Sequence, residues 1–190
     1  MNLRPVLDMF ASEDWERLAA DLLEALSALE RAGASFAAIA SNTPHIVWDR
    51  VRPASPLPLI SIVETVCREA RARQVKRPAL LGTSLTMRAD YYHRALRQYG
   101  MEAVSPNPEE QALIQHLLDT EIEKGVFRDE TRRRLLSIVE RMRAEDGIDA
   151  VILGCTELPL ILSEPAYGVP FLNTTNLHVK AIVERCQGQG

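Results

Sequence analysis

The feature that most constrains the fold is a short apolar run at 150–153 that ends in Gly154-Cys155-Thr156-Glu157. An apolar run of this length, closed by glycine and polar residues, predicts a strand buried on both faces, as in a parallel sheet. Ligands of α/β proteins bind where the carboxyl ends of such strands open into a crevice. The pattern therefore predicts that Cys155 lies at a functional edge of a parallel sheet.

A second stretch repeats this layout earlier in the chain. The apolar run at 35–40 is followed by Ser41-Asn42-Thr43 and by a predicted helix that opens near 44. Both stretches combine a buried strand, a small residue with a nucleophile-like side chain and a threonine close behind it. The repetition predicts two similar half-sites that face each other.

Strand and helix patterns alternate along the chain, which predicts an α/β fold with parallel sheets flanked by helices. A polar joint at 74–78 predicts two lobes, one formed by 1–75 with 166–190 and the other by 76–165. The last strand and helix are expected to complete the first sheet, and Ser12 is expected to cap the first helix. Strands are expected at 35–40, 59–63, 79–83, 101–104, 150–153 and 169–172, and helices at 12–32, 44–51, 87–99, 109–124, 129–144 and 175–186, with a further helix that ends near 73.

The composition of this 190-residue chain is that of an ordinary soluble globular protein, with 46% hydrophobic and 25% charged residues. A net charge of −4 and an isoelectric point near 5.6 give no reason to expect a nucleic-acid or membrane-surface partner. No apolar stretch is long enough to span a bilayer and the first residues do not begin a signal peptide, so we expect a cytoplasmic protein. The cysteines Cys67, Cys155 and Cys186 are expected to be free thiols, because their number is odd and their spacing matches no zinc site.

Three motifs carry a specific resemblance. They are Ser41-Asn42-Thr43-x-His45, Leu80-Leu81-Gly82-Thr83-x-x-Thr86 and Gly154-Cys155-Thr156-Glu157. Together they resemble the cofactor-independent aspartate/glutamate racemases of the Asp/Glu/hydantoin racemase superfamily, over nearly all of the chain. The resemblance implies two pseudo-symmetric lobes with the site in the cleft between them, an amino-acid substrate, no cofactor, no metal and a homodimer. The sequence itself has no dinucleotide-type glycine-rich loop and no lysine placed for a Schiff base.

The sequence departs from this family in two places. Ser41 stands where the racemases have their first catalytic cysteine, and the family's first strand, which ends in a Gly-Gly-Met-like turn, has no counterpart before Arg4. Because that strand lies in the interior of the first sheet, its absence would leave two rows of backbone groups unpaired. The first lobe is therefore expected to be truncated at its N-terminus, through a shortened chain or a late start codon, or else rearranged or swapped.

Racemisation without a cofactor removes a weakly acidic proton from one face of Cα and returns one to the other, which requires two proton carriers. By the resemblance Cys155 is one of them, although a buried thiol at a strand end can also be inert. Ser41 would occupy the opposite face, where an alcohol holds its proton too tightly unless a strong base such as His45 stands beside it. His45 can equally be a hydrogen-bonding residue of its helix.

Three explanations of Ser41 stay open: an engineered replacement, a natural one-thiol enzyme with different chemistry, or a protein that only binds. Related decarboxylases use a single cysteine to protonate the carbanion left by loss of carbon dioxide. The predicted function is racemisation of aspartate or glutamate, impaired by Ser41. A one-cysteine decarboxylase and a non-catalytic dicarboxylate-binding protein are the alternatives.

The resemblance also implies a set of substrate-binding residues. Short hydroxyl and amide side chains at helix N-termini suit a carboxylate, and Arg128 and Arg4 suit a second one because guanidinium groups bind carboxylates bidentately. Glu157 would orient the substrate ammonium or a neighbouring donor, and His178 would lie near the site at the start of the last helix. Each of these residues could instead be a cap or a solvated surface group. The hydroxyl and amide residues are Asn42, Thr43, Thr83, Thr86 and Thr156.

Overall fold

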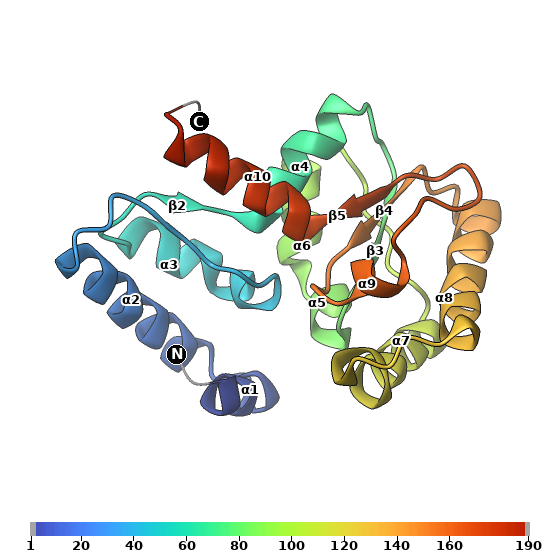
Figure 1. Ribbon diagram of the computed structural model, residues 1–190, viewed down its shortest axis with the longest axis horizontal. Coiled ribbons are helices and arrows are strands. Elements are labelled where there is room, and N and C mark those ends of the chain that lie inside the picture. Colours follow the sequence, from blue (N-terminus) through green and yellow to red (C-terminus); the bar gives the residue numbers. More distant parts are fainter. Residues whose placement is uncertain (1–2, 189–190) are drawn as a thin grey trace.

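The computed structural model, which describes residues 3–188, has two parallel sheets flanked by helices (Figure 1). The α/β fold predicted from the sequence is thus confirmed. The strands are β1 (Ala37–Ala38), β2 (Leu59–Ile60), β3 (Pro78–Leu81), β4 (Ala150–Leu153) and β5 (Phe171–Asn173). The helices are α1 (Leu3–Ser12), α2 (Trp15–Arg31), α3 (Trp48–Ala54), α4 (Ile62–Ala72), α5 (Ser84–Arg88), α6 (Asp90–Gln98), α7 (Pro108–Thr120), α8 (Asp129–Arg141), α9 (Leu158–Ile161) and α10 (Thr174–Cys186), with shorter helical turns η1 (Thr43–Val47), η2 (Ile122–Lys124) and η3 (Met142–Asp146).

The second sheet has the order β3-β4-β5, and all its strands are parallel. Val104 lies along the outer edge of β3, where its carbonyl accepts a hydrogen bond from the Leu80 N–H at 2.9 Å. Side chains of β4 alternate between two apolar cores: Val151 and Leu153 face the core shared with α7 and α8, and Ile152 faces the core shared with α4 and α6. This two-sided burial explains why the strand is apolar at every position.

The strand β5 does not complete the first sheet, as the sequence had predicted, but pairs with β4 in register Val151 to Phe171. The Val151 N–H donates to the Pro170 carbonyl at 2.9 Å, and Leu172 is buried in the core beneath α4 and α6. Only α10 returns toward the first lobe, where it packs along α4 and contacts β2. The strand within the predicted first-lobe segment 166–190 therefore belongs to the second sheet.

The first sheet of the described residues consists of β1 and β2, which pair directly in register Ala37 to Leu59. These two strands are hydrogen-bonded neighbours, so a missing strand would not lie between them, and the expected N-terminal truncation of the first lobe stays a prediction. One face of the sheet is covered by α1, α2 and α3, and Leu18, Leu22 and Leu26 recur at helical spacing on the buried side of α2.

Several element ends differ from the predicted ones for local reasons. The helix predicted at 12–32 begins later, as α2 at Trp15, and α1, which the sequence did not predict, precedes it; Glu13, with φ 54°, separates the two helices. Asp14 caps α2 by accepting from the Arg17 N–H at 3.1 Å, whereas the Ser12 hydroxyl donates to the Asp8 carbonyl at the end of α1. The helix predicted at 87–99 is split, since Ala89 has extended backbone.

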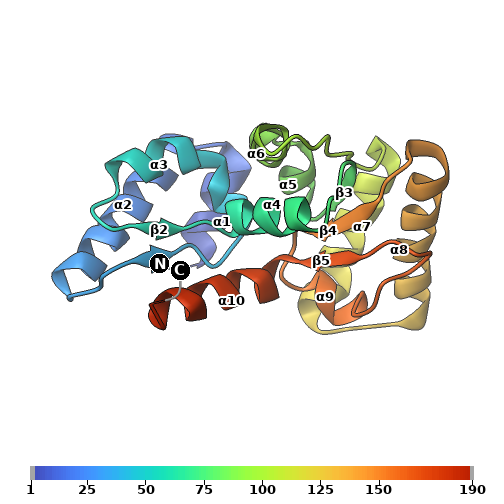
Figure 2. The same ribbon diagram turned by 90° about the horizontal axis from the view of Figure 1, so that it is seen from above.

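The two sheets repeat one arrangement. In each sheet, one apolar strand ends just before Ser41 or Cys155. The next parallel strand leads into a helix whose N-terminus is capped by a side chain, that of Ser61 for α4 and that of Asn173 for α10. Figure 2 shows α4 and α10 side by side between the helices of the first sheet on the left and the second sheet on the right. This internal repeat supports the predicted pseudo-symmetry. Among residues 3–188, no helix combines the length and apolar character that crossing a membrane would require.

Candidate active site

Two glycines bring the carboxyl ends of β3 and β4 into close contact. The Gly154 N–H donates to the Leu81 carbonyl at 2.6 Å, and a Cβ added to Gly154 would lie 3.0 Å from that same oxygen. A Cβ added to Gly82 would lie 3.2 Å from the backbone carbonyl group of Gly154. Because both positions lack side chains, the following residues, Thr83 and Cys155, emerge at one edge of the sheet.

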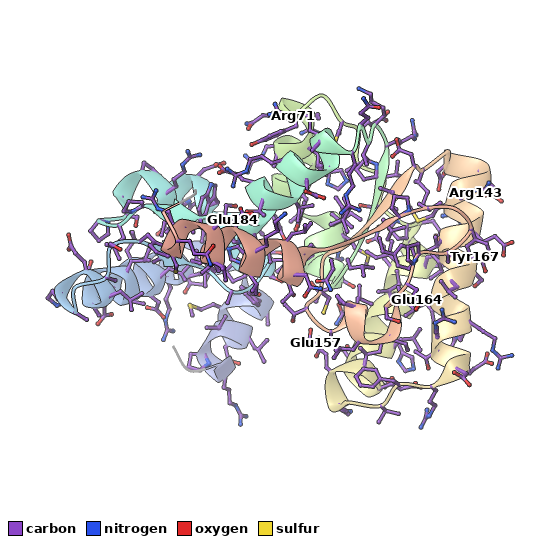
Figure 3. All side chains as sticks on the ribbon, turned by 45° about the horizontal axis from the view of Figure 1, so that its top comes forward. Arg71, Arg143, Glu157, Glu164, Tyr167 and Glu184 are labelled. Carbon is purple, nitrogen blue, oxygen red and sulfur yellow. The ribbon has the colours of Figure 1, made fainter. Side chains whose placement is uncertain are left out.

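Cys155 is buried and hydrogen-bonded to a carboxylate. Its side chain is 6% exposed, and its Sγ donates to Glu157 Oε2 at 3.0 Å. The Thr156 hydroxyl donates to the same oxygen at 2.6 Å, which fixes the carboxylate beside the thiol. Figure 3 shows Glu157 on the loop between β4 and α9. The structure thus brings together three of the predicted site residues.

The electrostatic surroundings keep the proton on the sulfur. Burial raises the pKa of the Cys155 thiol well above its ordinary value, and the hydrogen bond to Glu157 and the negative charges of Glu157 and Glu123 raise it further. A backbone hydrogen bond from Glu157 lowers this pKa, but the effects that raise it are larger in sum. At neutral pH Cys155 is therefore a thiol, suited to giving a proton.

Glu123, from η2, was not anticipated from the sequence. One oxygen of its carboxylate lies within 4.8 Å of the Cys155 sulfur and of a Glu157 oxygen. A thiol and two carboxylates are possible metal ligands. Exposed acidic groups often gather without an ion, so this trio alone does not indicate a metal, and the expected absence of a metal stays a prediction.

A chain of buried hydrogen bonds joins the first half-site to the second. The Asn42 amide Nδ2 donates to Thr174 Oγ1 at 3.2 Å, and the Thr174 hydroxyl donates to the Leu153 carbonyl at 2.9 Å. The Tyr92 hydroxyl donates to Asn42 Oδ1 at 2.6 Å. Two hydrogen bonds therefore connect the residue that follows Ser41 with the end of the strand that carries Cys155.

Thr86 is the centre of a second buried cluster. Its hydroxyl lies 3.2 Å from that of Thr43, 3.1 Å from that of Thr83 and 3.2 Å from that of Tyr91. A hydroxyl has one donor and two acceptor positions, so Thr86 has no capacity left for a ligand. Thr43, Thr83 and Thr156 are partly exposed, so these three threonines remain candidates for substrate binding.

Ser41 is partly exposed, and its contact with His45 is made by the backbone. The His45 Nδ1 lies 3.0 Å from the Ser41 carbonyl oxygen, not at the hydroxyl. Burial lowers the pKa of His45 to about 4, with its backbone hydrogen bond to Ser41 opposing the shift, so the imidazole is neutral at pH 7. The described geometry supports a hydrogen-bonding role for His45 and gives no base at the Ser41 hydroxyl.

The hydrogen bonds of His178 and Arg128 go to residues outside the Cys155 and Thr86 clusters. The buried His178 ring places Nε2 3.0 Å from the Ile60 carbonyl, which ties α10 to β2. Arg128, exposed at the start of α8, donates to Glu121 Oε1 at 2.8 Å. Arg4 is exposed on α1, which packs against α2. Their roles toward a substrate stay predictions.

The family model described as Asp/Glu/Hydantoin racemase matches residues 1–182. The chain belongs to this family. A broad specificity amino-acid racemase, RacX, from Bacillus subtilis (strain 168) is 24% identical over 170 residues, which cover 90% of this chain and 73% of that protein.

Solved structures give the same result. An aspartate racemase homologue from Pyrococcus horikoshii OT3 is 36% identical with a TM-score of 0.81, covering 92% of this chain and 76% of the other. A putative Asp/Glu racemase from Yersinia pestis is 26% identical with a TM-score of 0.89, covering 98% and 81%. The resemblance predicted from the three motifs is confirmed.

Proposed function

We propose that this protein is a cofactor-independent amino-acid racemase that moves a proton at Cα, with Cys155 as the proton carrier on one face and Ser41 on the other. The observation that carries the proposal is the buried Cys155 thiol, held 3.0 Å from the Glu157 carboxylate at the carboxyl end of β4. The membership of the racemase family and the names of its relatives support it.

Glu157 is the residue we propose as the proton partner of Cys155. The thiol already donates to its carboxylate, so the proton can pass to Glu157 Oε2 without rearrangement when a thiolate is needed. A substrate ammonium near Glu157 and Glu123 would offset the negative charges that hold the proton on sulfur. Substrate binding would thus lower the pKa of Cys155 and activate it.

Ser41 limits what this site can do. A serine hydroxyl is a much weaker acid than a thiol, and the described residues place no base at its oxygen. We therefore expect proton exchange on the face of Cys155 and slow return of a proton from the opposite face. The protein would then still carry out the first half-reaction, proton exchange on the Cys155 face, but would complete racemisation slowly.

Aspartate and glutamate are the substrates we propose to test first. Each has a side-chain carboxylate, and binding this second carboxylate requires a cationic residue. Arg128 is the candidate on the second lobe and Arg4 the candidate on α1. Because Arg128 is paired with Glu121, a dicarboxylic substrate would have to take the place of that carboxylate. By analogy with the family, we also propose that the protein is a cytoplasmic homodimer and that it needs no cofactor.

The test is α-proton exchange in deuterated water, followed by NMR, on both enantiomers of aspartate and glutamate, with alanine and lysine as further substrates. We expect one enantiomer to exchange without inverting and Cys155→Ala to abolish the exchange. Ser41→Cys should then add inversion. Exchange that persists in Cys155→Ala, or no exchange by the folded wild-type protein, would contradict the proposal.

A one-cysteine decarboxylase is the second candidate, and the protonated state of Cys155 favours it. Such an enzyme needs a thiol that gives its proton to a carbanion and no second thiol opposite. Release of carbon dioxide from a panel of malonates, lost in Cys155→Ala, would support this activity, and no release would remove it. A protein that only binds would show a raised melting temperature with a dicarboxylic amino acid and no exchange.

A further inference from the structure

Tyr91 is a buried tyrosine of α6 whose hydroxyl group is hydrogen-bonded to Thr86. Its side chain is 6% exposed, and the hydroxyl donates to Thr86 Oγ1 at 3.2 Å. Burial raises the pKa of this phenol, so the phenol keeps its proton at neutral pH. A buried donor normally finds an acceptor, and the Thr86 oxygen is the acceptor within reach among the described residues. Tyr91 therefore supplies a fixed donor to Thr86.

The hydroxyl of Thr86 is left with one direction for its own proton. Its oxygen accepts from Tyr91 at 3.2 Å and from Thr83 at 3.1 Å, and a hydroxyl oxygen has two acceptor positions. The Thr86 proton therefore goes to Thr43 Oγ1, which lies 3.2 Å away. Thr43 accepts in this bond, so its own proton stays available, and none of the described residues accepts that proton.

This hydroxyl cluster lies beside the end of the strand that carries Cys155. A Cβ added to Gly154 would lie 3.2 Å from Thr86 Cγ2, and a Cβ added to Gly82 would lie 3.1 Å from the same methyl group. Thr86 is thus packed against the residue that precedes Cys155, and Thr43 contacts it from the first half-site. Thr86 is fully buried, whereas Thr43 is partly exposed and within reach of a ligand.

We propose that Tyr91 is a positioning residue of the candidate active site, which fixes the direction of the Thr86 hydrogen bonds so that Thr43 donates its proton to a carboxylate oxygen of the substrate. The identity of the ligand, an amino acid, rests on the proposed function. A hydroxyl that donates to a carboxylate forms a charge-assisted bond. Without the Tyr91 hydroxyl, one acceptor position of Thr86 is vacant and can take the Thr43 proton, which then no longer serves the substrate.

The test is a double-mutant cycle on the dissociation constant Kd, measured by NMR titration. Racemic aspartate and racemic glutamate are the probes, because turnover does not change the composition of a racemic ligand. Thr43→Val should raise Kd about tenfold, since it removes a hydrogen bond to a charged group. Tyr91→Phe should raise Kd at least about threefold in the wild type but less than about 1.5-fold in the Thr43→Val background, because Tyr91 acts through Thr43.

Tyr99→Phe is the matched control, because Tyr99 directly follows α6 and packs its ring under the Arg71 guanidinium, 5.0 Å from the ring centroid. It should leave Kd unchanged. A merely structural role of Tyr91 would lower the melting temperature of Tyr91→Phe without changing the Kd of the folded protein. An unchanged Kd in Tyr91→Phe, or the same effect with and without Thr43, would overturn the inference.

The wild type without ligand gives a second readout. The buried hydroxyl proton of Thr86 should show its strongest nuclear Overhauser effect to Thr43. A strongest effect to Thr83 or to Tyr91 would overturn the inference even if Tyr91→Phe failed to fold, and so would the absence of saturable binding of both probes. Failure of the proposed function has a different signature, since the wild type would then show the expected pattern of Kd values but exchange no α-proton.

Discussion

At the scale of the residue, the state of one proton decides which chemistry the site supports. Cys155 is buried, donates to Glu157 and lies near Glu123, and each of these surroundings favours the thiol over the thiolate. Thiol reactivity depends on the fraction of thiolate and on access. The folded protein therefore holds Cys155, the cysteine that the proposed reaction uses, in the less reactive thiol form.

This protection predicts a pattern of alkylation. With iodoacetamide at pH 8, the exposed Cys186 should react first, and the buried Cys67 and Cys155 slowly. Glu157→Gln removes a negative charge beside the sulfur and should speed alkylation of Cys155 by about tenfold, the change in thiolate fraction that one pKa unit produces. Mass spectrometry of digested samples measures each site, with Cys67 as the internal control. An unchanged Cys155 rate in Glu157→Gln would contradict the assigned hydrogen bond.

His45 gives a prediction for stability against pH. Its pKa is lowered from 6.5 to about 4 in the folded protein by burial, so between these values the unfolded chain binds a proton that the folded chain does not. Stability present at pH 7 is therefore lost as the pH falls through 6.5 toward 4, by about 2 kcal/mol between pH 7 and pH 5. His178, whose pKa is also lowered, acts in the same direction.

Urea unfolding of wild type and His45→Asn at the two pH values tests this. The variant keeps His178 and every carboxylate, so the difference between the two proteins isolates His45. We expect the variant to lose about 2 kcal/mol less than the wild type between pH 7 and pH 5. Equal losses in the two proteins would show that His45 is not the group that stays neutral in the folded state.

At the scale of the elements, α10 joins the two half-sites through its first residue. Thr174 receives a hydrogen bond from Asn42 and donates to the Leu153 carbonyl, so one side chain connects the segment before η1, the end of β4 and α10. The next residue, Thr175, also has a buried hydroxyl, but that hydroxyl has no partner among the described residues. The chain thus offers a matched pair of neighbouring threonines.

We expect Thr174→Val to destabilise the fold by about 1–3 kcal/mol, because it leaves a buried amide N–H and a buried carbonyl unpaired. Thr175→Val should change stability by less than about 0.5 kcal/mol or raise it slightly, since it removes a hydroxyl that gains nothing from burial. Urea unfolding at pH 7 compares the two variants with wild type. Similar effects of both substitutions would argue against the network around Thr174.

The sequence predicted features that depend on local patterns, and it missed features that depend on contacts between residues far apart in the chain. Strand and helix periodicity, local in the chain, located β1 to β5 and most of the helices, and three motifs identified the family. It missed α1 and α9, and the strand predicted at 101–104 forms only an isolated bridge at Val104. The sheet that β5 joins was predicted wrongly, because a short apolar strand fits either sheet and the choice depends on contacts made far along the chain. The Asn42 bonds to Thr174 and Tyr92 span 132 and 50 residues, and no local pattern signals such pairings.

At the scale of the whole molecule, the two sheets differ in their burial and in the number of hydrogen-bonded strand neighbours. All residues of β3 and β4 are buried, and β4 has a hydrogen-bonded strand on each side. In the described residues β1 pairs over two residues with β2 on one side, and Ala38 is only partly buried. The half-site of Cys155 therefore rests on a rigid sheet and that of Ser41 on a smaller one.

This difference predicts unequal opening of the two half-sites. Segments with few buried contacts and short ladders open locally, whereas a central strand exchanges only when the whole protein unfolds. In hydrogen–deuterium exchange, amides at 36–40 should exchange at least about tenfold faster than those at 150–154 after correction for intrinsic rates, a difference of about 1.4 kcal/mol in opening free energy. A substrate that bridges the half-sites should slow the faster segment. Equal protection of the two segments without substrate would mean that the small sheet and the large sheet unfold as one unit, and that Ser41 is held as firmly as Cys155.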